Sequence, residues 1–176
     1  MIFSILTFIT LYLSVCIKNR KGSLTAQSIS CILESIYDFT INATTGAVTN
    51  FINFVRTILF INKKRFGNLV YFLILIIFEG VIIFSCINTW AGVISLFPAV
   101  GSFIRTFCLW QSDMKLVRLS GITTAIFYGI YYIHYGSLFM ICGYLLLFIT
   151  GIYSIWINDI KNIELSKDNS KHIYQV

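Results

Sequence analysis

Long apolar stretches alternate with short polar or charged segments along the whole chain. A helix that crosses a membrane needs about 20 predominantly apolar residues, and about 17 is the lower limit. By this criterion the sequence predicts seven spanning helices, at residues 1–17, 25–42, 47–62, 68–87, 90–110, 115–133 and 137–157. The remaining residues, 158–176, are polar and are predicted to form a tail.

The composition supports this reading of the apolar stretches. Hydrophobic residues make up 57% of the 176 residues and charged residues only 11%, whereas roughly 25% of a typical soluble chain is charged. A chain with so little polar surface requires lipid around it. The sequence therefore predicts an all-α integral membrane protein, with one transmembrane domain at residues 1–157 and the bilayer as its first partner.

The basic residues predict the orientation of the helices, because loops rich in Lys and Arg face the cytoplasm. They lie in every second connection or just after it: Lys18, Arg20, Lys21, Lys63, Lys64, Arg65, Lys115 and Arg118. The alternate connections, around 43–46, 88–90 and 134–136, contain no Lys or Arg. This pattern predicts an external N-terminus, a cytoplasmic C-terminal tail and an odd number of spans. It also accounts for the net charge of +6 without nucleic-acid binding.

The predicted helices divide into two similar groups of three. Residues 1–62 and 90–157 share one layout: a helix, a basic connection, a helix, a tight turn with glycine, and a third helix. Both groups have the same predicted orientation, as expected for a parallel repeat related by an axis along the membrane normal. Residues 68–87 would then be a linker helix in a 3+1+3 arrangement.

Polar residues within the predicted spans are the strongest chemical signal. A charged side chain near the bilayer centre costs at least about 2.5–3.5 kcal/mol, so such residues normally face a bundle interior or water. Glu34 and Asp38 are four residues apart and share one helical face. Asn50, Asn53 and Arg56 follow a three-residue spacing on the next helix. The pattern predicts that Glu34 or Asp38 neutralises Arg56 while the asparagines line a cavity.

Two interpretations of these residues remain open. In the first, they form a pocket for a solute or an ion, in which a protonated carboxylic acid relays protons. In the second, they are polar contacts that hold helices together. Glu79 is a further candidate for proton transfer, unless it reaches the outer interface. Arg105 is expected to extend its side chain towards the inner interface.

Aromatic and helix-bending residues provide further candidates. Tyr128 belongs to a tyrosine run that could line a sugar-binding wall or form an aromatic belt at the membrane interface. The other members of the run are Tyr131, Tyr132 and Tyr135. Pro98 and Gly101 are predicted to form a hinge, because a proline within a helix frees a carbonyl group and bends the helix.

Enzyme signatures are absent from the sequence. It contains no phosphate-binding glycine loop and no nucleophile elbow. The five cysteines are scattered singly, and the two histidines are far apart. We therefore expect neither an enzyme, nor a metal site, nor a cofactor.

Three short motifs carry a family resemblance: residues 53–57 (NFVRT), 97–102 (FPAVGS) and 132–137 (YIHYGS). The sequence resembles the bacterial inner-membrane YgjV family, which implies a multi-pass protein of that membrane. More distantly, the 3+1+3 layout resembles the SWEET and PQ-loop (MtN3-like) transporters. Members of that group carry sugars or other small solutes between two three-helix bundles.

The second resemblance has clear departures. PQ-loop proteins place Pro-Gln in the first helix of each repeat, but here Pro98 is followed by Ala99 and the first helix has no proline. Sugar-carrying SWEETs flank the substrate with asparagines from the third helix of each repeat. Asn53 suits that role in the first repeat, whereas its counterpart in the second is Gly143. The resemblance thus supports the architecture more strongly than the activity.

The sequence-based hypothesis is a small-solute transporter or facilitator with alternating access between the two helix triplets. A sugar is one candidate substrate, and the proton is a candidate coupling ion. The alternative is a structural or accessory inner-membrane protein that does not transport. Whether two copies associate is left open. The predicted substrate-binding residues are Asn53, Asn50, Glu34, Asp38, Arg56 and Tyr128.

Overall fold

The computed structural model describes residues 2–17, 19–61, 68–111 and 113–157. Within these residues the chain forms seven α-helices and no strand, as the sequence predicts. The helices are α1 (Ile2–Cys16), α2 (Arg20–Thr40), α3 (Thr44–Ile61), α4 (Asn68–Asn88), α5 (Leu96–Trp110), α6 (Met114–His134) and α7 (Leu138–Ile155). The predicted tail at 158–176 lies outside the described residues.

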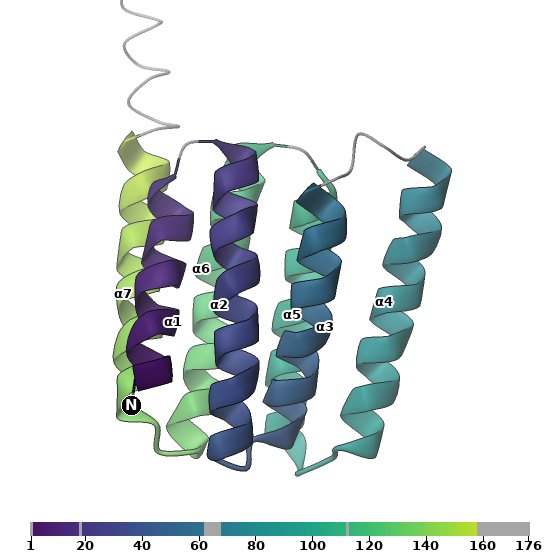
Figure 1. The fold of residues 1–176 in the computed structure, drawn as a ribbon, viewed down its shortest axis with the longest axis vertical. Helices are drawn as coiled ribbons and strands as arrows, with labels where there is room; N and C mark the ends of the chain where they lie inside the picture. The colour runs from purple at the N-terminus through teal and green to yellow at the C-terminus, as the bar shows by residue number, and fades with distance from the viewer. Residues whose placement is uncertain (1, 18, 62–67, 112, 158–176) are drawn as a thin grey trace, which may run out of the picture.

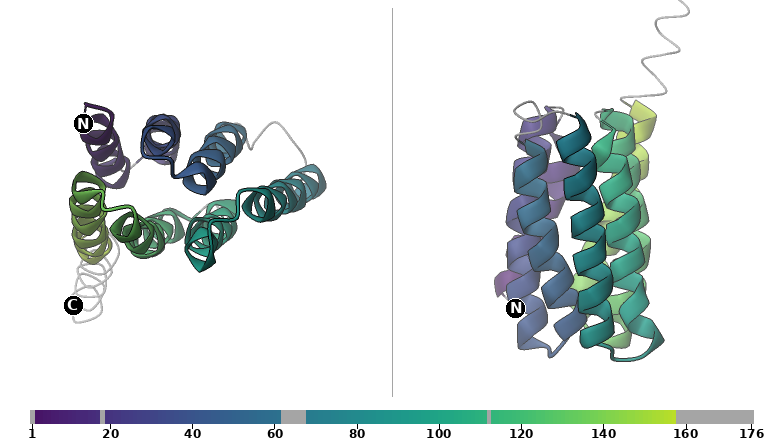
Figure 2. Two further views of the ribbon diagram at one scale, coloured as in Figure 1. Left: turned by 90° about the horizontal axis from the view of Figure 1, so that it is seen from below. Right: turned by 90° about the vertical axis from the view of Figure 1, so that its right-hand side faces the viewer.

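The seven helices stand side by side, and each runs antiparallel to the next (Figure 1). Viewed along the helix axes, α1, α2 and α3 form one row and α4 to α7 form a second row against it (Figure 2). At one edge α1 contacts α7, and further along α3 contacts α5. Helix α4 packs against α3 and α5 at the other edge. The two rows therefore enclose a long interface between them.

Local sequence signals explain where the helices begin and end. Asn19 and Asp113 are the N-caps of α2 and α6, and each side chain accepts a hydrogen bond from the backbone N–H two residues later. Such caps satisfy donors that the first helical turn leaves open. At the opposite end of the bundle, the turns use positive φ angles at Asn42 (57°), Gly92 (96°) and Gly136 (64°). Asn and Gly adopt this conformation more readily than other residues.

Helix α5 begins later than the sequence predicts. The predicted span starts at residue 90, but residues Val93–Ser95 form a 3-10 turn and the α-helix starts at Leu96. Pro98 consequently lies in the first turn of α5, where its missing N–H removes no helical hydrogen bond. Gly101 lies one turn further along, against the side chains of Phe127 and Tyr128.

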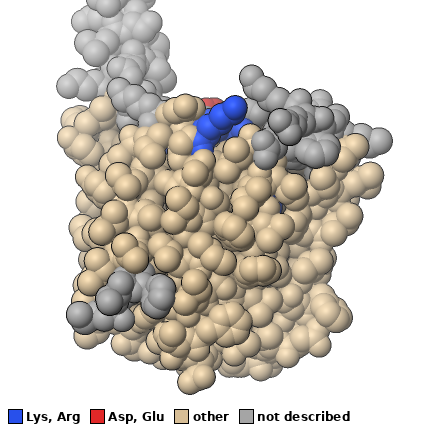
Figure 3. Space-filling view, in the orientation of Figure 1, with Lys and Arg blue, Asp and Glu red and all other residues tan. Residues whose placement is uncertain are grey.

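The outward surface of the bundle is apolar. Large hydrophobic side chains are exposed on many helices, among them Phe84, Phe107 and Leu138. Figure 3 shows one lateral face that is almost free of Lys, Arg, Asp and Glu side chains. Within the described residues, three helical segments are long and apolar enough to cross a membrane: Val93–Trp110, Lys115–His134 and Leu138–Ile155. Shorter apolar segments occur at Ile5–Ser14 and Phe72–Asn88.

Charge is distributed unequally between the two ends of the bundle. Lys21 and Lys115 are exposed at the end where α1 joins α2 and α5 joins α6 (Figure 1). We call this the basic end. The connections at the opposite end, residues 41–43, 89–92 and 135–137, carry no Lys or Arg. This is the asymmetry on which the orientation predicted from the sequence rests.

Candidate functional site

The interface between the two rows is filled by polar side chains. They come from five helices, α2, α3, α5, α6 and α7, and nearly all of their surface is buried. We call this group the polar cluster, and its members are Glu34, Asp38, Asn50, Asn53, Arg56, Ser102, Thr106, Tyr128, Tyr131, Tyr132 and Tyr144. All six residues predicted to bind substrate belong to it, so the structure brings together what the sequence separates.

Asp38 organises the part of the cluster that is farthest from the basic end. Its carboxylate accepts a hydrogen bond from the hydroxyl of Tyr132 at 2.7 Å and another from the amide of Asn50 at 2.9 Å. The nearby hydroxyl of Tyr131 accepts a bond from the backbone N–H of Gly46 at 2.9 Å. These bonds join α2 and α3 of the first row to α6 of the second.

Glu34 and Asn53 occupy the middle of the cluster. The carboxylate of Glu34 accepts a hydrogen bond from the hydroxyl of Tyr144 at 2.8 Å. The amide nitrogen of Asn53 donates to the hydroxyl of Tyr128 at 3.2 Å, and its oxygen accepts from the hydroxyl of Ser102 at 2.5 Å. Each of these three contacts crosses from one row to the other.

Arg56 lies nearer the basic end and faces α5. Its guanidinium donates to the carbonyl and hydroxyl oxygens of Ser102, both at 3.1 Å, and to the hydroxyl of Thr106. The prediction that Glu34 or Asp38 neutralises Arg56 is therefore wrong. Both oxygen-bearing partners of Arg56 are on α5, whereas the carboxylates of Glu34 and Asp38 bond to tyrosine and asparagine side chains. The carboxylate that attracts Arg56 electrostatically is Glu79 of α4.

The structure also changes the interpretation of Glu79 and Arg105. Both side chains are buried, with 6% of their surface exposed, so neither extends to a membrane interface. One carboxylate oxygen of Glu79 and the Nε of Arg105 are buried without a hydrogen-bond partner. Arg105 is a cation that attracts Glu34. Acidic and basic residues of different helices thus attract each other: Glu34 of α2 with Arg105 of α5, and Arg56 of α3 with Glu79 of α4. The pattern of one helix alone does not show these pairs.

The tyrosines of α6 do not form an interfacial belt. Tyr128, Tyr131 and Tyr132 are at most 1% exposed and point into the bundle. The rings of Tyr128 and Tyr132 stack on Tyr144 of α7, with centroids 5.7 Å and 5.5 Å apart. These rings therefore line the inside of the bundle, where the hydroxyls of Tyr132 and Tyr144 donate to Asp38 and Glu34.

Three members of the cluster were missed by the sequence reasoning: Ser102, Thr106 and Tyr144. Ser102 and Thr106 are four residues apart, the same spacing as Glu34 and Asp38, so the same rule would have placed them on one face of their helix. Tyr144 lies in an otherwise apolar helix and is preceded by Gly143. Nothing in that local pattern distinguishes it from a tyrosine that faces lipid.

The hydroxyl of Tyr144 provides a direct test of the contacts across the rows. In the Tyr144→Phe variant the ring remains but the buried carboxylate of Glu34 loses a donor. We expect the free energy of unfolding to fall by about 1–2 kcal/mol, measured by denaturant titration in detergent micelles. Tyr153→Phe on the exposed side of the same helix is the matched control and should leave stability unchanged. Equal stability of the two variants would contradict this account of the Glu34 contact.

The acidic side chains of the cluster are held by hydrogen bonds. Among the described residues no group of three or more His, Cys, Asp or Glu side chains is placed to hold a metal ion. The carboxylates of Glu34 and Asp38 bond to tyrosine and asparagine side chains instead. Hydroxyl, amide and carboxyl groups are the chemistry that the cluster offers.

Comparison with known proteins identifies a family. No curated protein sequence and no solved structure matches the chain. The family model Imp-YgjV, described as a bacterial inner membrane protein, matches residues 1–163, which include all seven helices. The apolar outer surface and the buried charges are consistent with that location. The chain therefore belongs to the Imp-YgjV family of bacterial inner membrane proteins.

Proposed function

We propose that the protein is a small-solute transporter of the bacterial inner membrane, in which the two helix rows move against each other and open the polar cluster alternately to each side. The observation that carries this proposal is the nature of the contacts between the rows. Asp38 with Tyr132, Glu34 with Tyr144, and Asn53 with Tyr128 are side-chain hydrogen bonds. Groups that bond to each other in a closed state can bond to water or a solute in an open one.

An internal repeat would supply the two moving halves. A rotation by 180° about the membrane normal would exchange α1 with α5, α2 with α6, and α3 with α7. The contact of α1 with α7 then corresponds to that of α5 with α3. The bond from Tyr144 to Glu34 likewise corresponds to the one between Asn53 and Tyr128, because each joins a third helix to the middle helix of the other triplet. These correspondences support a 3+1+3 arrangement with α4 as the linker.

The chemistry of the cluster favours a neutral solute rich in hydroxyl groups, such as a sugar. Amide and carboxylate groups bond to sugar hydroxyls, and tyrosine rings pack against the apolar faces of a sugar. Protons are the natural coupling ion, because Glu34 and Asp38 both lie on the interface that would open. Basic loops face the cytoplasm, which puts the N-terminus outside and the C-terminus inside.

Counterflow uptake into proteoliposomes tests the proposal. The panel contains labelled sugars, polyols, nucleosides and small acids. We expect uptake of one neutral solute, and Asn53→Ala should reduce it by about tenfold, equivalent to a loss of about 1.4 kcal/mol in binding. The matched control is Asn88→Ala, since Asn88 is exposed at the end of α4. Uptake that is unchanged in folded Asn53→Ala protein would remove Asn53 from the site.

One observation favours a second candidate function. The polar groups of the cluster bond directly to one another, which is also how a static membrane scaffold would hold its helices together. A structural or accessory protein would show no uptake of any solute in the panel by folded wild-type protein. In that case variants in the cluster would change stability alone.

A further inference from the structure

An apolar groove lies at the edge of the bundle where α4 packs against α5 (Figure 1). Its volume is about 250 Å³, whereas an apolar cavity of about 150 Å³ already holds benzene. On α4 its wall extends from Glu79 to Ile87, over which a helix rises about 12 Å. Ile83 and Phe103 line it and are more than half exposed, so the groove opens to the surface that lipid covers in the membrane. A molecule dissolved in the bilayer can therefore enter it from the side.

Glu79 gives this groove a polar end. Among the described residues that line the groove it is the acidic one, and none of them is basic. Its side chain is only 6% exposed, and the carboxylate oxygen Oε1 is buried without a hydrogen-bond partner. Leaving a buried acceptor unpaired is costly. The groove therefore combines a hydrogen-bond acceptor that lacks a donor with an apolar wall along the rest of its length.

The charge of Glu79 is balanced from a neighbouring helix. The guanidinium group of Arg56 on α3 attracts it electrostatically. However, Arg56 donates its hydrogen bonds to Ser102 and Thr106 of α5, so this attraction leaves Oε1 of Glu79 without a donor. A second cation is not needed at this position. A neutral O–H group would satisfy the carboxylate oxygen without adding charge.

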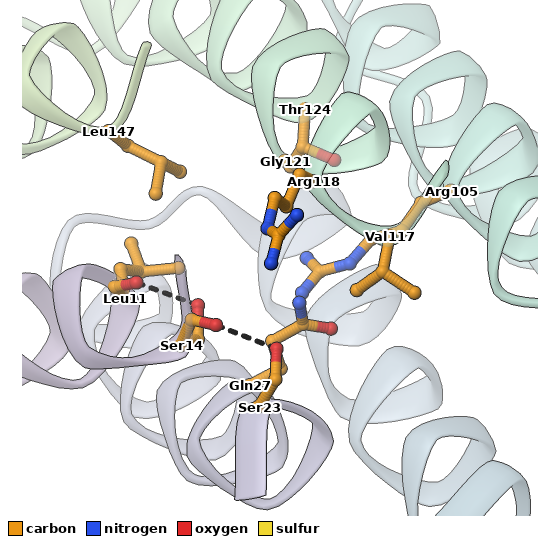
Figure 4. A pocket seen from close by; sticks show the side chains of 10 residues that line it. All are labelled: Leu11, Ser14, Ser23, Gln27, Arg105, Val117, Arg118, Gly121, Thr124 and Leu147. Atoms are coloured by element: carbon orange, nitrogen blue, oxygen red, sulfur yellow. Dashed lines mark hydrogen bonds between the residues drawn. The ribbon is translucent and has the colours of Figure 1, made fainter. Parts of the chain in front are cut away.

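Two other cavities lack this combination. The cavity between the rows, drawn in Figure 4, has a volume of about 10 Å³, which is the room that one buried water molecule requires. A groove of about 290 Å³ lies between α6 and α7, but the hydroxyl of Tyr144, which lines it, already donates to Glu34. Of these three, the groove between α4 and α5 is the one that joins space for a ligand to an unsatisfied polar atom.

We propose that this groove binds a long-chain alcohol from the bilayer, whose hydroxyl donates to Glu79 while its hydrocarbon chain lies between α4 and α5 towards Trp90. The apolar wall selects the chain, and the open acceptor selects the hydroxyl. Hydrogen bonds to a carboxylate are stronger than those between neutral groups, so an acyl chain without a donor binds less tightly. The groove lies outside the interface between the rows, and the inference stands whether or not the protein transports.

Quenching of Trp90 fluorescence tests this binding, because Trp90 lines the groove at the end away from Glu79. The full-length protein in lipid nanodiscs carries Trp110→Phe and Trp156→Phe, so that Trp90 alone emits. The probe is ω-bromododecanol, whose quenching bromine is at the end opposite the hydroxyl, and bromododecane is its match without a hydroxyl. At equal mole fraction in the lipid, we expect the alcohol to reach half-maximal quenching at about a tenfold lower concentration.

Competition and comparison of the two probes decide the outcome without a groove variant. Unbrominated dodecanol should reverse the quenching, and dodecane should reverse it far less. Equal quenching curves for the two brominated probes would overturn the proposal and would mean that the groove accepts any apolar chain. Quenching that rises linearly without saturation would overturn it as well, because it would reflect contact with free probe in the lipid.

Variants separate the hydroxyl contact from the apolar wall. Glu79→Leu removes the acceptor and should abolish the tenfold preference for the alcohol, whereas Glu79→Gln keeps an acceptor oxygen and should retain a preference. Ala99→Leu fills the groove from α5 and should weaken the binding of both probes. Its matched control is Ala91→Leu, an exposed position that does not line the groove.

A preference for the alcohol that persists in folded Glu79→Leu protein would contradict the hydroxyl contact. Unchanged binding in Ala99→Leu would contradict the location of the chain. Ala99→Leu leaves the attraction between Glu79 and Arg56 in place, so it tests the site even if Glu79→Leu fails to fold. None of these measurements depends on solute uptake, and their outcome is separate from that of the transport experiment.

Discussion

Replacing Gly46 by alanine is expected to lower the free energy of unfolding by about 2 kcal/mol, because the new methyl group has no space. A Cβ atom at this position would lie 2.7 Å from a carboxylate oxygen of Asp38 and 2.8 Å from the ring of Tyr131. Both neighbours are buried and hydrogen-bonded, so neither can move without breaking a contact between helices. The N–H of Gly46 itself donates to Tyr131, and a shift of α3 would weaken that bond as well.

The control for this variant is Gly80→Ala on α4. A Cβ atom there would meet nothing within 4 Å, and alanine is the better helix former by about 1 kcal/mol. We therefore expect Gly80→Ala to be neutral or slightly stabilising in the same denaturant titration. If Gly46→Ala were as stable as Gly80→Ala, the close approach of α3 and α6 at the polar cluster would be wrong.

The helices themselves were accessible from the sequence because their signals are local. Apolar stretches of spanning length, separated by charged or turn-forming residues, predict seven helices, and seven are found in the described residues. The largest differences have local causes too. Helix α2 begins at Arg20 because Asn19 caps it, although a hydropathy criterion excludes the charged first turn.

The sequence predicts part of the polar cluster. The cost of burying charge predicts that Glu34, Asp38 and Arg56 face the interior, and all three are at most 2% exposed. The hydrogen-bond partner of each of these side chains depends on how the two rows pack. The sequence of a single helix contains no information on that packing. The same limit explains why the sequence predicts an interfacial side chain for Arg105 and leaves two locations open for the α6 tyrosines. A residue near a helix end can face lipid or a neighbouring helix, and only the packing decides.

The internal repeat is harder to interpret from the sequence than the helices are. The sequence layout suggests two equivalent triplets, and the arrangement of the rows is compatible with them. A shared layout does not mean that the two triplets carry the same side chains, however. By sequence alignment the counterpart of Asn53 is Gly143, and it is the next residue, Tyr144, that lies in the interface between the rows. The two halves of the cluster therefore differ in chemistry, with an amide from α3 in one and a phenol from α7 in the other.

Replacing Arg56 by leucine is expected to lower the free energy of unfolding by about 3 kcal/mol, since it leaves a buried carboxylate without its positive neighbour. Ser102 and Thr106 would lose their donor at the same time. Lys21→Leu, which removes an exposed positive charge, should have a much smaller effect. Thermal and denaturant unfolding in detergent micelles measure both variants.

A double-mutant cycle then identifies the carboxylate that Arg56 serves. The structure pairs Arg56 electrostatically with Glu79, whereas the sequence pattern pairs it with Glu34 or Asp38. We therefore expect Glu79→Gln to recover at least about 1 kcal/mol of the stability lost in Arg56→Leu, because it removes the uncompensated buried charge. Glu34→Gln should give no such recovery, since Arg105 is the cation that attracts Glu34. Recovery by Glu34→Gln and not by Glu79→Gln would restore the pairing suggested by the sequence and would mean that Glu79 of α4 is not the carboxylate that balances Arg56.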